Sequence, residues 1–271
     1  MGAEEFRLIF YYGFVTSVNL YVESCGAGQD LALLHGWAMH SGVWNGVKEK
    51  LAHHFRLHIV DLPGYGQSPI STPNTLEHIA ALIASSLPER VSLCGWSLGG
   101  LIAMEIARKY PEKTAHLVLV ASTPCFVRRE NWRYAMVPET LLEFANALEC
   151  QYESTLKRFI TLQARGDNDS KTVSRLLRES QYTAAKPSIK TLTEGLKILI
   201  DTDLRGLTGY PPALIVHGDR DRLVPLRAAL WQFRHRPGSQ LKIIHGAAHA
   251  PFLSHPAEFV ETLKNYWDAH G

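Results

Sequence analysis

The chain has 271 residues, of which 46% are hydrophobic and 20% are charged, as is usual for a globular protein that buries a substantial core. The 28 lysines and arginines and the 26 aspartates and glutamates leave a formal net charge of +2, which argues against a nucleic acid as the main partner. Four cysteines without a C-x-x-C pair argue against a zinc site or a disulfide framework, and no run of about 18 apolar residues predicts a membrane span.

The first residues, MGAEEFRLIFYYGFV, place acidic residues ahead of an apolar run and contain no small-residue cleavage site, so they do not predict a signal peptide. We expect the residues before about Val18 to form a loose extension. The stretch NLYVESCGAGQD that follows is typical of an antiparallel strand leading into a turn. The widely spaced cysteines and the lack of a signal-peptide pattern favour a reducing, cytoplasmic setting.

Strands and helices alternate along most of the remaining chain. Short β-branched or leucine-rich runs, separated by helical stretches, occupy residues 30–122 and return over residues 211–267. This alternation predicts a mostly parallel, doubly wound α/β sheet with helices on both faces. Within residues 128–203 the strand signals give way to helical spacing, which predicts an all-helical insertion into a core formed by residues 1–127 and 204–271. We expect the insertion to act as a lid over the edge where strand carboxyl ends gather and ligands bind.

One serine stands at a strand-to-helix junction inside a G-x-S-x-G pattern. The stretch GWSLG, residues 95–99, follows a predicted strand and precedes a predicted helix, which is the context in which this pattern indicates a nucleophile. Gly95 and Gly99 leave room for a tight turn that exposes the Ser97 hydroxyl at the positive end of the helix. The alternative is that Ser97 only caps the helix.

A serine nucleophile needs a general base, and that base needs an orienting acid. In the stretch VHGDRDRLVP, Asp219 and Asp221 compete for the role of the acid. We favour Asp221, because Leu223 and Val224 follow it and would pack it into a dry site. Asp219, close to two arginines, has the surroundings of a turn or salt-bridge residue.

Thirteen histidines are present, and His249 is the one best placed to be the base. It lies in IIHGAAHAPF, on a loop of small residues after the last predicted strand, from which its ring reaches the ligand edge of the sheet. His245 should still belong to the strand or its first turn. His255 is expected to cap the helix that follows.

Acyl transfer also requires donors for the developing oxyanion. The backbone amide of Leu98, directly after the proposed nucleophile, is one candidate, and that of Trp37, in the loop HGWAMHSGVW, is the other. His35 is expected to make a structural hydrogen bond beneath this loop. Asp61, in DLPGYGQS, is also expected to be structural.

The motifs LLHGW, DLPGYGQS, GWSLGG, HGDRDRLVP and AAHAPFLSHPAEF, in this order, resemble the α/β-hydrolase superfamily over residues 18–268. Within that superfamily the stretches ASTPCF, KRFITLQ and LKILIDTDLR are similar to those of the carboxylesterases that hydrolyse pimeloyl-ACP methyl ester in biotin synthesis. This resemblance implies a monomeric esterase that releases methanol and uses Ser97, His249 and Asp221, without a metal, nucleotide or flavin. Trp37 and Phe159 are the residues expected to contact the substrate, although Phe159 is equally expected to pack within the lid.

An acyl carrier protein is acidic, so the resemblance further implies cations on the insertion. Residues 154–190 contain eight lysines and arginines against three acidic residues. Arg158, Lys171 and Arg175 match positions that contact the carrier in the family, whereas Ser154 replaces an arginine that the family has there. The alternative interpretation of these cations is an ordinary solvated helix face.

Other functions share much of this pattern. A broad carboxylesterase that cleaves small free esters would use the same three residues without a carrier protein. A hydrolase of carbon–carbon bonds would share the serine turn and the lid. A binding module that keeps only the fold is a further alternative, against which the intact serine, histidine and aspartate argue.

Overall fold

One seven-stranded sheet forms the centre of the computed structural model, which describes residues 18–207 and 211–270. The strand order is β1-β3-β2-β4-β5-β6-β7, and only the edge pair β1 and β3 is antiparallel. The strands are β1 (Val22–Cys25), β2 (Gln29–Leu34), β3 (Phe55–Val60), β4 (Val91–Trp96), β5 (Thr114–Val120), β6 (Ala213–Gly218) and β7 (Gln240–Ile244). The doubly wound sheet predicted from the alternation is therefore present, and the expected N-terminal extension lies outside the described residues.

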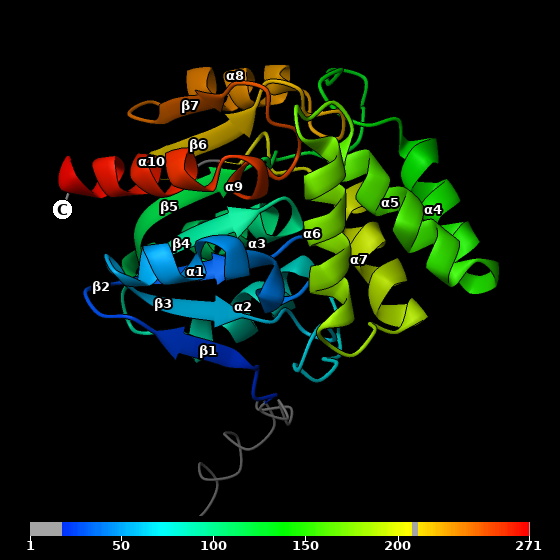
Figure 1. Ribbon diagram of the computed structural model, residues 1–271, viewed down its shortest axis with the longest axis horizontal. Coiled ribbons are helices and arrows are strands. Elements are labelled where there is room, and N and C mark those ends of the chain that lie inside the picture. Colours follow the sequence, from blue (N-terminus) through cyan, green and yellow to red (C-terminus); the bar gives the residue numbers. More distant parts are fainter. Residues whose placement is uncertain (1–17, 208–210, 271) are drawn as a thin grey trace, which may run out of the picture.

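Helices cover both faces of the sheet, as Figure 1 shows. One face carries α1 (Asn45–Ala52), α9 (Pro251–Ser254) and α10 (Pro256–Asp268), and the other carries α2 (Leu76–Ser86), α3 (Leu98–Lys109) and α8 (Leu226–His235). Alternate residues of a strand point to opposite faces, so Leu31 and Leu33 join one buried cluster while Ala32 and Leu34 join the other. Two short 3₁₀ helices, η1 (Ser41–Trp44) and η2 (Pro111–Lys113), lie in the connections.

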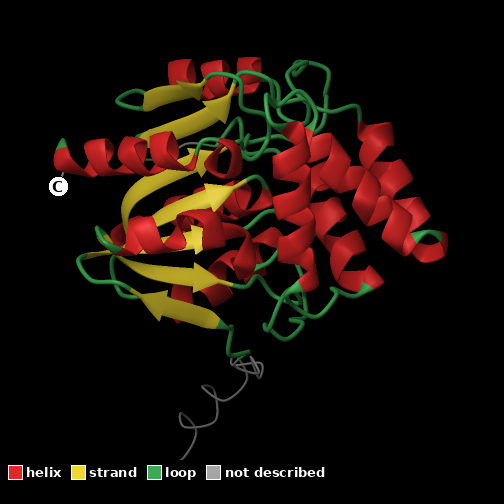
Figure 2. Ribbon diagram, viewed as in Figure 1, coloured by secondary structure: helices red, strands yellow, loops and turns green. Residues whose placement is uncertain are grey.

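Four consecutive helices stand between β5 and β6, within the stretch for which the sequence predicts a helical insertion. They are α4 (Pro138–Cys150), α5 (Tyr152–Ala164), α6 (Ser170–Tyr182) and α7 (Ile189–Asp201). Figure 2 shows them gathered beyond the arrowheads of the parallel strands, at the carboxyl edge of the sheet. The long periodic run from residue 138 to 163 is two helices, because Gln151 leaves helical geometry with φ −140° and ψ 46°.

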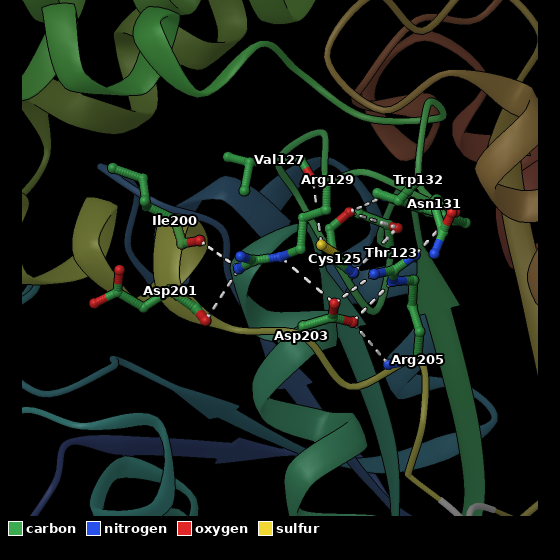
Figure 3. A network of polar contacts seen from close by, with 10 residues as sticks. All are labelled: Thr123, Cys125, Val127, Arg129, Asn131, Trp132, Ile200, Asp201, Asp203 and Arg205. Carbon is green, nitrogen blue, oxygen red and sulfur yellow. Dashed lines mark hydrogen bonds and ion pairs between the residues drawn. The ribbon is translucent and has the colours of Figure 1, made fainter.

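A polar network fastens the start of the insertion to its end (Figure 3). Asp203 accepts two hydrogen bonds from Arg205, at 2.6 and 2.8 Å, and lies 3.5 Å from Arg129. Arg129 donates to the carbonyls of Ile200 and Asp201, at the end of α7. The hydrogen bonds from Arg205 lower the pKa of Asp203 despite its partial burial. The two crossings between the core and the insertion are thereby joined through charged groups.

None of the helices in residues 18–207 and 211–270 is long and apolar enough to cross a bilayer. In the same ranges, no three His, Cys, Asp or Glu side chains are grouped so that they could hold a metal ion. The four cysteines are free thiols.

Candidate active site

The turn that carries Ser97 is strained, and close packing of glycines permits it. Ser97 has φ +55°, a value that L residues rarely adopt, between the end of β4 and the start of α3. A Cβ on Gly95 would lie 2.2 Å from the Gly99 carbonyl oxygen, and one on Gly99 would lie 2.3 Å from that of Leu34. The Ser122 hydroxyl, in the loop after β5, donates to the Ser97 carbonyl at 2.8 Å and holds the turn. The Ser97 side chain makes no cap hydrogen bond, so the helix-cap alternative does not describe its hydroxyl.

Ser97, His249 and Asp221 form one hydrogen-bonded chain. The Ser97 hydroxyl lies 3.0 Å from His249 Nε2, and His249 Nδ1 lies 2.8 Å from Asp221 Oδ2. A carboxylate only accepts, so His249 donates through Nδ1 and its Nε2 is free to accept from the serine. The three side chains come from loops after β4, β6 and β7, and all are buried. The sequence separates Ser97 from His249 by 152 residues, and the sheet brings them together.

Asp221 is held as a carboxylate by several donors. Its Oδ1 accepts from the backbone amides of Leu223 at 2.8 Å and Val224 at 3.0 Å. Burial by itself raises the pKa of Asp221, but the neighbouring His249 and His217 rings and the Val224 amide outweigh burial, so the pKa lies below its usual value. His217, which the sequence analysis did not single out, is fully buried, donates to the Val224 carbonyl and lies 3.6 Å from Asp221 Oδ2. Burial lowers its pKa, which keeps the ring neutral.

Two residues of the insertion hold the loop that carries His249. The His249 amide donates to the Gln163 carbonyl at 3.2 Å, and the Ala248 amide donates to Asp167 Oδ2 at 2.8 Å. From the sheet side, Trp96 Nε1 donates to the His249 carbonyl at 2.7 Å. Sequence analysis missed these residues, because nothing in the local pattern of residues 163–167 points to a loop some 80 residues later.

The loop after β2 lies against Ser97. A Cβ on Gly36 would lie 3.3 Å from Ser97 Cβ, which places the neighbouring Trp37 amide beside the serine turn. Neither the Trp37 nor the Leu98 amide donates to a backbone carbonyl within the described part of the chain. His35 accepts from the Leu62 amide at 3.0 Å and lies 2.8 Å from the Gly36 carbonyl, as expected for a structural support. Its burial lowers the pKa to about 4, so the ring is neutral near pH 7.

Side chains of the insertion contact this same loop. Trp37 Nε1 donates to the Leu192 carbonyl at 2.8 Å, and its ring packs edge-on against Phe159 with centroids 4.6 Å apart. Gln181 Nε2 donates to the carbonyl of Ala38, whose φ of +61° is strained. His40 contacts the Ser180 carbonyl through Nε2. The loop beside Ser97 is therefore fixed from α5, α6 and α7.

Asp61, Asp219 and His255, which the sequence analysis also considered, do not take part in the hydrogen bonds that link Ser97, His249 and Asp221. Asp61 accepts from the amides of Ser41 and Gln67, as expected for a structural carboxylate. Asp219 lies in a turn as expected, and its hydrogen-bond partners are His245 at 2.9 Å and the Gly246 amide, not the adjacent arginines. His255 occupies the N-cap position of α10 but makes no side-chain cap hydrogen bond, because its ring contacts Ser254.

The three cations singled out on the insertion lie on α5 and α6, and their side chains are exposed. Arg158 lies 3.7 Å from Glu143 and over the Phe144 ring, and Arg175 lies 2.8 Å from Glu179. Lys171 has no carboxylate within 4.0 Å among the described residues. Ser154 is exposed on α5 and donates to the Gln151 carbonyl.

The chain matches the α/β hydrolase fold family over residues 31–256. It is 47% identical over 244 residues to a pimeloyl-[acyl-carrier protein] methyl ester esterase from Nitrosomonas europaea, covering 89% of this chain and 97% of the relative. A second such esterase, from Nitrosospira multiformis, is 39% identical over 258 residues, which is 92% of this chain and 98% of that one.

Among solved structures, an esterase from Exiguobacterium antarcticum superposes with a TM-score of 0.81 at 26% identity. The superposition covers 91% of this chain and 94% of that one. The serine turn, the seven-stranded sheet and these similarities agree with one another. The chain therefore belongs to the α/β hydrolase fold family and, within it, to the pimeloyl-[acyl-carrier protein] methyl ester esterases.

Proposed function

We propose that this carboxylic ester hydrolase converts the methyl ester of pimeloyl-ACP to pimeloyl-ACP and methanol, a step of biotin synthesis. The observation that carries the proposal is the hydrogen-bonded chain from Ser97 through His249 to Asp221. Relatives named for this reaction, with 39% and 47% identity, support the choice of substrate.

Ser97, His249 and Asp221 each have a separate role in the proposed mechanism. The Ser97 hydroxyl attacks the ester carbonyl while His249 Nε2 takes its proton, and Asp221 stabilises the resulting imidazolium. The amides of Trp37 and Leu98 bind the oxyanion of the tetrahedral intermediate, a contribution of about 3 kcal/mol per donor in comparable sites. His249 then protonates the departing methanol, which leaves an acyl-enzyme. Water attacks that ester with His249 again as base and releases the acid, so no step needs a cofactor.

We assign substrate recognition to the helical insertion, residues 128–203, acting as a lid on the core of residues 1–127 and 204–271. Trp37 and Phe159 would contact the acyl chain, since their rings meet beside the loop of Ser97. Arg158, Lys171 and Arg175 would bind the acidic carrier protein, since all three are exposed on α5 and α6 of the insertion. We further propose a monomeric, cytoplasmic enzyme, in keeping with its four free thiols.

The first experiment compares kcat/KM for the methyl ester of pimeloyl-ACP with that for a small p-nitrophenyl ester, with Ser97→Ala as the blank. We expect a strong preference for the carrier-linked ester that declines at high salt, because exposed charges are screened. Activity on the small ester alone would support the alternative of a broad carboxylesterase. Cleavage of a carbon–carbon bond and no methyl ester would support the other alternative.

A charge-reversal pair separates docking from chemistry. Arg158→Glu with Arg175→Glu should lower kcat/KM for the carrier-linked ester by about 10-fold or more while changing the small ester little. Arg227→Glu with Arg234→Glu, two exposed positions on α8 of the core, makes the same change in net charge and is the matched control. Equal losses on both substrates would contradict the docking role.

A further inference from the structure

A second strained residue lies beside the Ser97 turn. Ala121, the first residue after β5, has φ +45°, and Ser97 has φ +55°. The Ser97 amide donates to the carbonyl of Val120 at 3.0 Å, so the two strained positions are joined through the end of β5. Strained backbone persists only where its surroundings hold it in place. The residues that hold the segment after β5 therefore also affect the position of Ser97.

Ser122 connects this segment to the serine turn and to α8. Its hydroxyl donates to the Ser97 carbonyl at 2.8 Å, and its own carbonyl accepts from Gln232 Nε2, on α8, at 2.7 Å. Ser122 lies close to the turn, since a Cβ on Gly100 would lie 2.5 Å from Ser122 Cβ. Both Ser122 and Gln232 are buried. Two buried hydrogen bonds thus join α8 to Ser97 through one residue.

Gln232 is a polar residue on the buried face of α8. Its buried neighbours on that helix are Ala228 and Ala229. Burying a side-chain amide costs free energy unless it is hydrogen-bonded, and an apolar side chain of similar length would fill this place without that cost. Within residues 18–207 and 211–270 the Gln232 Oε1 accepts no hydrogen bond, so the amide contributes through its Nε2 alone. Gln232 is therefore explained better by what it positions than by the stability it adds.

The same helix is also connected to the loop of Asp221. Val224, whose amide donates to Asp221 Oδ1 at 3.0 Å, lies two residues before α8, and Gln232 lies in the second turn of that helix. A helix is a rigid element, so groups held at its two turns keep a fixed separation. The contacts of α8 thereby set the place of the Ser97 turn relative to Asp221.

We propose that Gln232 is a positioning residue for the proposed reaction. Through Ser122 it holds the Ser97 turn where the hydroxyl lies 3.0 Å from His249 Nε2. A shift of this turn would lengthen that hydrogen bond, and proton transfer depends steeply on such geometry. Because Gln232 is buried behind the turn, its loss should lower kcat and leave KM unchanged. The inference rests on the proposed function, since it takes Ser97 as the nucleophile.

Gln232→Met tests the role directly, because it removes the amide donor and changes the side-chain volume little. With the small p-nitrophenyl ester, we expect kcat to fall about 10-fold while KM stays within about 2-fold of wild type. The rate at which a phosphonate labels Ser97 should fall by the same factor, whereas the midpoint of urea unfolding should change little. An unchanged kcat would overturn the proposal. Gln232→Leu, which also lacks the donor, repeats the test if the methionine variant does not fold.

Trp132→Phe is the matched control. Trp132 Nε1 donates to the Cys125 carbonyl at 2.9 Å, so this variant also removes a buried donor to the loop after β5, but at a carbonyl three residues beyond Ser122 (Figure 3). It should lower the urea midpoint and leave kcat within about 2-fold of wild type. An equal fall in kcat would mean that any loosening of this loop lowers activity, and it would overturn a specific role of Gln232.

A double variant tests the path through Ser122. Ser122→Ala should lower kcat about 10-fold, and adding Gln232→Met should lower it little further, because both residues act on one series of contacts. Effects that multiply would contradict this path. Ser97→Ala separates the inference from the proposed function. Retained turnover in Ser97→Ala would refute the nucleophile itself, whereas an inactive Ser97→Ala beside a fully active Gln232→Met would refute only the inference.

Discussion

The core and the helical insertion differ in how their polar side chains are buried and bonded. In the core, Ser97, Asp221 and His249 are 6%, 6% and 2% exposed and are bonded to one another in sequence. On the insertion, Arg158, Arg175 and Lys186 are exposed and make single ion pairs on the surface. Buried hydrogen bonds fix geometry, whereas exposed pairs contribute little stability and exchange partners readily. We therefore expect the chemistry to take place in the core and the insertion to recognise the substrate.

The separation is incomplete where the two regions meet. Gln163 and Asp167 of the insertion hold the loop of His249, and Gln181 holds the carbonyl of Ala38. The insertion therefore positions groups around Ser97 as well as covering them.

The largest effect is expected from a change in the buried hydrogen bonds of the core. Asp221→Asn should lower kcat for a small ester by about 10³-fold to 10⁴-fold, because an amide no longer stabilises the imidazolium and favours the wrong tautomer of His249. KM should change little. Asp219→Asn is the matched control, since this carboxylate lies two residues away but bonds to His245, and its kcat should stay within about 3-fold of wild type. A comparable fall in both variants would remove the distinction between the two aspartates.

The next effect concerns the stability of the core as pH falls. Because burial lowers the pKa of His35 to about 4, the unfolded chain binds a proton between pH 6.5 and 4 that the folded chain does not. The contribution of His35 to the free energy of unfolding is therefore fully present above pH 6.5. It decreases as pH falls to 4, by about 3 kcal/mol for this one ring.

Urea unfolding of wild type and His35→Gln across this range measures the contribution of His35. The variant should be less stable at pH 7 but should lose less stability on acidification. Between pH 7.5 and 8.5 the two curves should run parallel, since His35 is neutral there in both states. If the variant lost stability equally steeply as pH falls, the pH dependence would belong to other groups. One of them is His217, since burial lowers its pKa as well.

The smallest effect is expected from changes in the ion pairs of the insertion. Asp203→Asn removes the paired hydrogen bonds with Arg205 at the base of the insertion and should lower the unfolding free energy by about 1 kcal/mol. Glu179→Gln, which breaks the exposed pair with Arg175, should cost about 0.4 kcal/mol. Both variants lose one negative charge, so their difference in urea unfolding reports the network in Figure 3. Equal losses would mean that the network adds nothing beyond a surface pair.

Sequence patterns predicted the parts of this protein that depend on neighbouring residues. The alternation of strands and helices, the insertion of helices and the turn at Ser97 follow from local spacing and from the room that Gly95 and Gly99 leave. The preference for Asp221 over Asp219 agrees with their contacts, because Asp221 alone of the two reaches His249. The catalytic roles of these residues stay predictions.

Other features depend on contacts that no local pattern encodes. His245 pairs with Asp219 across 26 residues, Gln163 reaches the His249 loop from the insertion, and His217 packs beneath Asp221. Such contacts form only when the strands align in one sheet and the insertion closes over its carboxyl edge. The fold class can be predicted from the sequence alone, because it follows from short-range sterics and hydrophobic periodicity. Which side chains meet depends on the tertiary structure, because long-range packing sets the distances between groups far apart in the chain.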